Sequence, residues 1–129
     1  MPTMTPEELR ARTMEFAVRA VKFCRSLPDT SEARRIGGQL IDSSTSVAIN
    51  YRAAGRGRSH REFTAKIGIV TEEADETLGW LELIVRLDLA RGPEAEWLTI
   101  VDQLTIPDQL TIADHPISDR PIHITEALP

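Results

Sequence analysis

The chain has 129 residues, of which 41% are hydrophobic and only six are aromatic, so we expect one domain with a mainly aliphatic core. No apolar run approaches the roughly 18–20 residues that cross a bilayer, which argues against a membrane protein. No basic-then-apolar leader opens the chain, and the single Cys24 cannot form an internal disulfide, so we expect a cytoplasmic protein.

The net charge of −5 is unevenly distributed. Up to Arg91 there are 14 basic and 13 acidic residues, whereas one basic and seven acidic residues follow from Gly92 onward. The nearly neutral body and the acidic tail argue against tight nonspecific nucleic-acid binding through bulk charge. A local basic patch is still compatible with this distribution.

The first predicted helix begins after Thr5. Pro6 suits the first helical position, and Glu8 completes a Thr-x-x-Glu capping box. Spacings of four and three then predict a buried stripe that Pro28 should end. The stripe consists of Leu9, Thr13, Phe16, Ala20, Phe23 and Leu27.

The second predicted helix starts at a cap provided by Asp29, Thr30 or Ser31 and runs to about Ala54. Its apolar members are Ala33, Ile36, Leu40, Val47, Tyr51 and Ala54. Small residues interrupt them, which predicts a close contact between two helices. These small residues are Gly37, Gly38, Ser43, Ser44, Thr45 and Ser46.

The third predicted helix covers residues 60–89. Ser59 and Glu62 have the spacing of a second capping box, and Glu62 can pair with Lys66 one turn later. Gly92 and Pro93 should end the helix. Its buried stripe is Phe63, Ile67, Val70, Ala74, Leu78, Leu81 and Val85.

A fourth helix is expected from Pro93, but its pattern fails at the repeated DQLTIP and DQLTIA segments, where Pro107 should break or kink it. The fold class is therefore all-α: an antiparallel up-and-down four-helix bundle over residues 1–106, with a shortened or kinked fourth helix. Residues 107–129 are predicted to form a proline-rich acidic tail, irregular or loosely attached. Short strands in the LTI units are the alternative.

Residues 44–83 resemble a family of four-helix-bundle proteins encoded within intervening sequences of bacterial 23S ribosomal RNA genes. The resemblance covers roughly residues 13–105. The matching residues are Ser44, Thr45, Ser46, Val47, Asn50, Tyr51, Ala54, Arg58, Ser59, Phe63, Lys66, Glu73, Ala74, Glu76, Trp80, Leu81, Glu82 and Leu83.

The resemblance implies a left-handed antiparallel bundle that assembles into a homopentameric ring. The family is also similar to the accessory variability protein of diversity-generating retroelements, which binds nucleic acid and a reverse transcriptase. Three features depart from the family pattern: Gly79 replaces a frequent aromatic, Ala53 replaces a frequent Glu, and the tail is acidic where the family often has a basic one. The acidic tail counts against nucleic-acid binding by this member.

No constellation in the sequence predicts catalysis, a metal site or a cofactor. A di-iron bundle needs Glu-x-x-His pairs, and no such pair occurs. Cys24 has no activating neighbour in its helix and is interpreted as a structural thiol. Asn50 and Tyr51 are interpreted as a hydrogen-bonded structural pair, and residues 55–59 as a plain turn. We therefore expect a non-enzymatic protein.

Two charged clusters are the candidate functional sites. Arg52, Arg56, Arg58, Arg61 and Lys66 are candidates for binding nucleic acid or another anion. Arg52 and Arg56, one turn apart, and the acidic residues Glu72, Glu73 and Glu76 are candidates for an oligomer interface. The near-neutral body favours carboxylates of a neighbouring copy as the partner of the arginines. RNA, DNA or a reverse transcriptase are the other candidate partners, and an interaction scaffold without nucleic acid is the alternative function.

Overall fold

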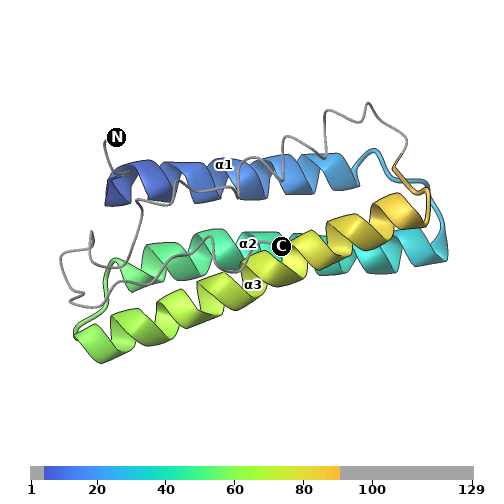
Figure 1. Ribbon diagram of the computed structural model, residues 1–129. Helices are drawn as coiled ribbons and strands as arrows, with labels where there is room; N and C mark the ends of the chain where they lie inside the picture. The colour runs from blue at the N-terminus through green and yellow to red at the C-terminus, as the bar shows by residue number, and fades with distance from the viewer. Residues whose placement is uncertain (1–4, 91–129) are drawn as a thin grey trace.

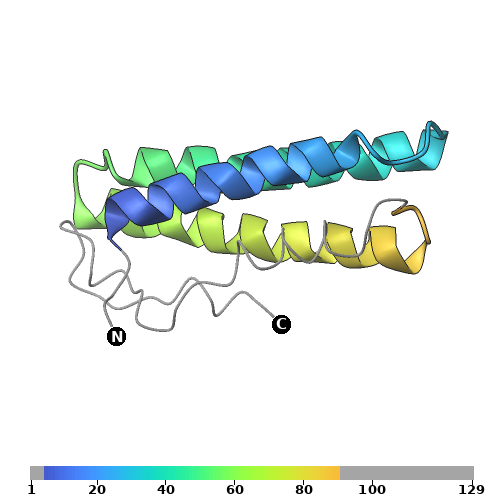
Figure 2. The same ribbon diagram turned by 90° about the horizontal axis from the view of Figure 1, so that it is seen from above.

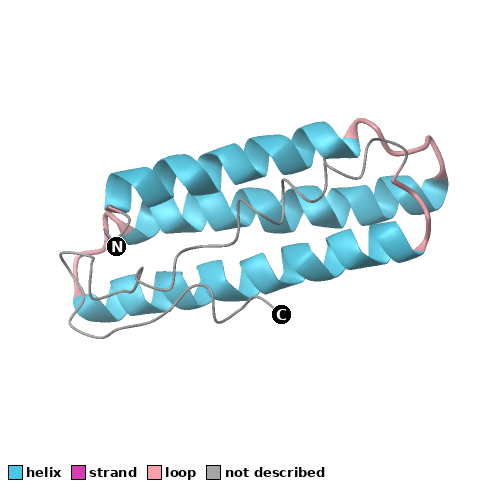
Figure 3. Cartoon of the chain, turned by 45° about the horizontal axis from the view of Figure 1, so that its top comes forward, coloured by secondary structure: helices cyan, strands magenta, loops and turns pink. Residues whose placement is uncertain are grey.

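The structure is a computed structural model that describes residues 5–90, which fold into three helices (Figure 1). They are α1 (Pro6–Cys24), α2 (Ser31–Ala54) and α3 (His60–Arg86). Successive helices run antiparallel, and α2 packs against both neighbours (Figures 1 and 2). All regular structure in residues 5–90 is helical (Figure 3). The all-α prediction is confirmed there, while the predicted fourth helix and the tail at 107–129 lie outside the described residues.

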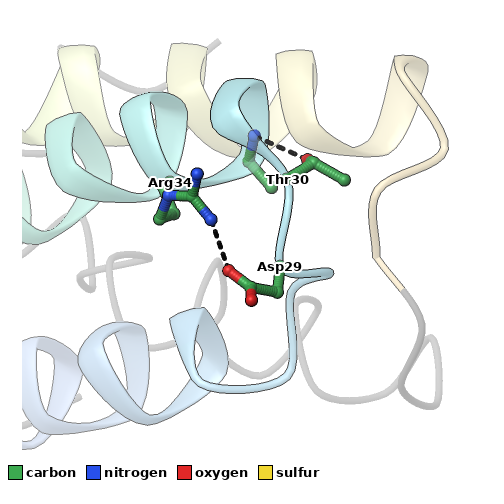
Figure 4. A network of polar contacts seen from close by, with 4 residues as sticks. Asp29, Thr30 and Arg34 are labelled. Atoms are coloured by element: carbon green, nitrogen blue, oxygen red, sulfur yellow. Dashed lines mark hydrogen bonds and ion pairs between the residues drawn. The ribbon is translucent and has the colours of Figure 1, made fainter.

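The helix starts follow the predicted caps closely. The Thr5 hydroxyl accepts the Glu8 N–H at 3.1 Å, and a Glu8 carboxylate oxygen accepts the Thr5 N–H at 2.9 Å, so the first capping box is complete. Thr30 caps α2 by accepting the Ala33 N–H. Next to that cap, Asp29 pairs with Arg34 across the first turn of the helix (Figure 4).

The second capping box forms only in part. Ser59 accepts the Glu62 N–H at 3.1 Å, as predicted. The Glu62 carboxylate accepts the N–H of Arg58 at 2.6 Å instead of that of Ser59. Glu62 therefore fixes the turn one residue earlier than the box requires, and the predicted pairing with Lys66 is wrong within residues 5–90, where Lys66 forms no ion pair.

The C-terminal ends of two helices differ from the prediction. α1 ends at Cys24 rather than Leu27, because the next three N–H groups bond to carbonyls three residues back. α3 ends at Arg86 rather than Leu89, because Asp88 adopts a left-handed φ of 57°. The Leu89 N–H then bonds to the Ile84 carbonyl at 3.0 Å, which closes a Schellman motif with buried Leu89.

The predicted inner stripes form the core almost completely. Three expected members, Leu27, Ile36 and Val85, are only half-buried, and Ile84 takes the core position expected of Val85. The small-residue patch of α2 makes the predicted close contacts. A Cβ on Gly37 would lie 3.3 Å from Cδ1 of Leu27.

On the other side of α2, the Ser43 hydroxyl meets the Thr77 hydroxyl of α3 at 2.9 Å. Both side chains are buried. This bond links the two helices near their middles and fixes which residues of α2 and α3 lie at the same height along the bundle.

Candidate interaction surface

The predicted basic residues gather at the end of the bundle where α2 turns into α3. Arg52 lies in the last turn of α2, Arg56 and Arg58 lie in the connecting turn, and Arg61 lies in the first turn of α3. These four arginines are exposed, whereas Lys66 is half-buried. None of the five side chains forms an ion pair with another residue in the range 5–90.

The prediction that Arg52 and Arg56 share a helical face is wrong, because α2 ends at Ala54, before Arg56. The Arg56 N–H bonds to the Ala53 carbonyl at 3.0 Å in a tight turn. Arg56 instead lines a hollow of about 520 Å³ at this end of the bundle. The described residues around this hollow are Ala53, Arg56, Gly57, Arg58, Glu62, Ala65, Lys66 and Ile69.

The predicted acidic residues form a second cluster in the middle of α3. Glu72 and Glu76 are exposed, and Glu73 is half-buried beside them. Burial raises the pKa of Glu73 above its ordinary value, and the neighbouring Glu76 carboxylate raises it further. Glu72 and Asp42 of α2 add to this repulsion. The cluster therefore holds four carboxylates, none with a basic partner in the described part of the chain.

Sequence reasoning missed Asp42, because its approach to Glu73 depends on how α2 packs on α3. It also missed a set of apolar side chains that point outward from the bundle. Met14, Val18, Ile49, Ile69, Leu83 and Leu87 are large hydrophobic residues that remain exposed. Met14 and Val18 are four residues apart, as are Leu83 and Leu87, and this helical spacing was the signal that could have revealed them.

Three glycines on the helix surfaces accompany these apolar residues. Within residues 5–90, a Cβ added at Gly38, Gly68 or Gly79 would meet nothing within 4 Å, so contacts in this part of the chain do not explain these glycines. Gly79 and Trp80 border a second hollow of about 790 Å³, whose described lining also includes Leu83 and Leu87. Small and apolar residues on an exposed face are typical of a surface that contacts another molecule.

The side chains considered for chemistry have structural surroundings. The Cys24 thiol lies 3.5 Å from the Gly37 carbonyl, and burial raises its pKa to about 11, so it is a poor nucleophile. The Asn50 amide donates to the carbonyl and the hydroxyl of Ser46. The predicted hydrogen bond between Asn50 and Tyr51 does not form within residues 5–90. Over the same range, no group of three or more His, Cys, Asp or Glu residues could hold a metal ion. No helix of that range is long and apolar enough to cross a membrane.

Comparison with known proteins gives two matches. A family model described as 23S rRNA-intervening sequence protein matches residues 8–104. The chain is also similar to the crystal structure of a protein of unknown function from the S23 ribosomal protein family of Bacteroides thetaiotaomicron VPI-5482. The two sequences are 29% identical, with a TM-score of 0.65 over 74% of this chain and 86% of that chain. No curated protein matches.

Proposed function

Because the chain belongs to the family of 23S rRNA-intervening sequence proteins, we propose that it is a non-catalytic helical scaffold that assembles with copies of itself into a closed ring. The observation that carries the proposal is the pair of oppositely charged clusters. Each cluster lacks a partner of opposite charge within residues 5–90. Five copies per ring follow from the family resemblance.

The clusters lie apart on the chain, which suits a head-to-tail contact. Arg52 lies near one end of the bundle, whereas Glu72, Glu73 and Glu76 occupy the middle of α3. A contact between two different patches is heterologous, and repeated heterologous contacts close into a ring when the rotation between copies permits it.

Light scattering on the purified full chain tests the ring directly. We expect a mass of about five chains at micromolar concentration and a loss of mass as salt increases, because exposed ion pairs are screened. Reversing Glu72 to Lys should lower the mass at fixed salt, whereas the matched change Glu32→Lys at the start of α2 should not. A monomer mass for the parent at every micromolar concentration would refute the proposal.

Nucleic-acid binding through the basic cluster is the second candidate. Arg56, Arg58 and Lys66 line one hollow next to the start of α3, where several cations could contact a phosphate backbone. The charge balance works against it, because the chain up to Arg91 has one excess basic residue and the part beyond it is acidic. In this role the protein would be a cytoplasmic accessory subunit that holds RNA or DNA, alone or with a reverse transcriptase.

A comparison of arginine variants separates the two candidates. Phosphate binding predicts that Arg56→Ala with Arg58→Ala weakens binding to unrelated RNA and DNA sequences alike, with about one counterion fewer released per lost contact. The ring mass should not change. Arg35→Ala, an exposed arginine near the other end of α2, is the matched control. No binding by the parent at about 50 mM salt rules out this candidate and leaves the ring untouched.

A further inference from the structure

The outward sides of α2 and α3 each carry a second seam, separate from the core stripe. On α3 this outward seam consists of Ile69, Glu72, Glu76, Gly79 and Leu83. All five are exposed, with 37% of Ile69 and 38% of Leu83 accessible. Spacings of three and four keep the five residues on one side of the helix, as in helices that pack along a partner helix.

The outward seam of α2 has the same spacing in the opposite order. It consists of Gly38, Asp42, Thr45, Ile49 and Arg52. Ile49 is the most exposed large apolar side chain in residues 5–90, at 58%. Gly38 has open space where a Cβ would stand.

The hydrogen bond between Ser43 and Thr77 sets the relative height of the two seams. Because α2 and α3 are antiparallel, each step forward from Ser43 is level with one step back from Thr77. Thr45 is thus level with residue 75, one residue from Glu76, a difference of about 1.5 Å. The same offset holds along both seams.

A closed ring preserves these heights when its helices stand along the symmetry axis, because rotation moves each residue around the axis and not along it. All copies also point the same way, so α2 of one copy and α3 of the next are antiparallel. We infer that the outward seam of α2 docks on the outward seam of α3 of the neighbouring copy. The residues that lie beside each other are Gly38 and Leu83, Asp42 and Gly79, Thr45 and Glu76, Ile49 and Glu72, and Arg52 and Ile69. This inference rests on the proposed ring and names the two surfaces that form it.

Size is complementary along this register, and charge is complementary at its Arg52 end. The large Leu83 lies opposite Gly38, and Gly79 lies opposite the larger Asp42, so a glycine leaves room at both positions. Ile49 and Ile69 become diagonal neighbours, which covers two exposed apolar side chains. Arg52, beside Ile69, is one layer from Glu72, within reach of its long side chain. The register therefore accounts for the open glycines Gly38 and Gly79, the exposed isoleucines, and the charges of Arg52 and Glu72. Asp42 and Glu76, also one layer apart, are like charges that weaken the contact at that layer.

Disulfide trapping between two differently substituted chains tests the register. A chain carrying Ile49→Cys is mixed with one carrying Glu72→Cys, allowed to exchange subunits and oxidised. Because a disulfide needs Cβ atoms about 3.5–4.5 Å apart, we expect a covalent heterodimer on a non-reducing gel. Ile49→Cys with Leu83→Cys is the control, since Leu83 lies eleven residues, or about 16 Å, from the matched position. The half-buried native Cys24 is present in every sample and reports any background band.

The outcomes separate the inference from the proposed function. Light scattering on each reduced variant first shows whether it still assembles. If a variant of the matched pair does not assemble, the pair Thr45→Cys and Glu76→Cys, one layer along the seam, is used in its place. Rings that form but trap only the Leu83 control, or trap no pair, overturn the register and leave the ring in place. A parent chain that is monomeric overturns both, whereas heterodimers of the matched pairs alone support both.

Discussion

The inward and outward sides of α3 share an alternation of three and four residues but differ in what covers them. Ile67 on the inward side is 1% exposed, whereas Ile69, two residues later, is 37% exposed. The inward side consists of apolar residues and small ones, and the outward side mixes apolar residues with carboxylates and glycine. Periodicity alone identifies a side that can pack, and the mixture of residues distinguishes a core from a surface that meets a partner.

Truncating the inward isoleucine should give the largest difference between the two sides. Ile67→Ala should lower the free energy of unfolding by about 2–5 kcal/mol, because it leaves a cavity in the core. Ile69→Ala, the matched control, should lose about 0.5 kcal/mol or less in the dissociated chain, where no neighbouring copy covers it. Urea unfolding followed by circular dichroism at one chain concentration measures both. Equal losses would show that the outward side is buried as deeply as the inward one.

The buried hydroxyl pair between α2 and α3 should give the next largest effect. Thr77→Val removes the hydroxyl that meets Ser43, and Ser43 keeps its bond to the Leu40 carbonyl, so the loss should be about 0.5–1.5 kcal/mol. Thr71→Val is the control, because the Thr71 hydroxyl bonds only to the Ile67 carbonyl of its own helix in residues 5–90. The double variant Ser43→Ala with Thr77→Val should lose less unfolding free energy than the sum of the losses in the two single variants. Additive losses in this double-mutant cycle would mean that the two hydroxyls are not coupled.

Glycine replacement compares the inward contact of α2 with the open surface of α3. Gly68→Ala should stabilise the protein by about 0.5–1 kcal/mol, because alanine suits a helix better and its Cβ meets nothing within 4 Å. Gly37→Ala should gain less than Gly68→Ala, because the same helix preference is opposed by a new Cβ that would lie 3.3 Å from Cδ1 of Leu27. Thermal unfolding of the two variants beside the parent gives the difference. An equal gain for both would contradict the distinction between a packed and an open glycine.

The smallest expected effect comes from the acidic cluster and depends on pH. The folded chain raises the pKa of Glu73 above 4.5, so ionised Glu73 opposes folding at neutral pH. This penalty disappears as the pH falls through the raised pKa. Glu73→Gln should therefore gain a few tenths of a kcal/mol at neutral pH, and the gain should vanish below the ordinary pKa. Asp75→Asn, on the solvent side of α3, is the control, and a gain that persists in acid would contradict the repulsion.

Local chemistry made most of the described fold predictable from the sequence. The caps at Thr5 and Thr30 and the inner stripes depend on residues within one or two turns of each other, so their spacing was sufficient. The end of α3 was not predictable in this way, because Asp88 is not a residue that requires a left-handed backbone. Here the Schellman motif and the burial of Leu89 decide where the helix ends.

The candidate site was predictable in its residue types and less so in its geometry. The basic and acidic clusters lie at the predicted places along the chain. The position of Arg56 depended on where α2 stops, and the addition of Asp42 to the acidic cluster depended on the packing of two helices. Neither depends on spacing within one helix, which is why the pattern of a single helix did not reveal them.

Because the Cys24 thiol contacts Gly37, the reaction rate of this cysteine can be used to follow the separation of α1 from α2. The half-buried thiol touches the second helix, and its raised pKa keeps it protonated at neutral pH. A thiol reagent that needs the thiolate should therefore react mainly when the helices part and release the sulfur into water. The alkylation rate then reports the fraction of time that the two helices are apart, in the unaltered protein and without any attached probe.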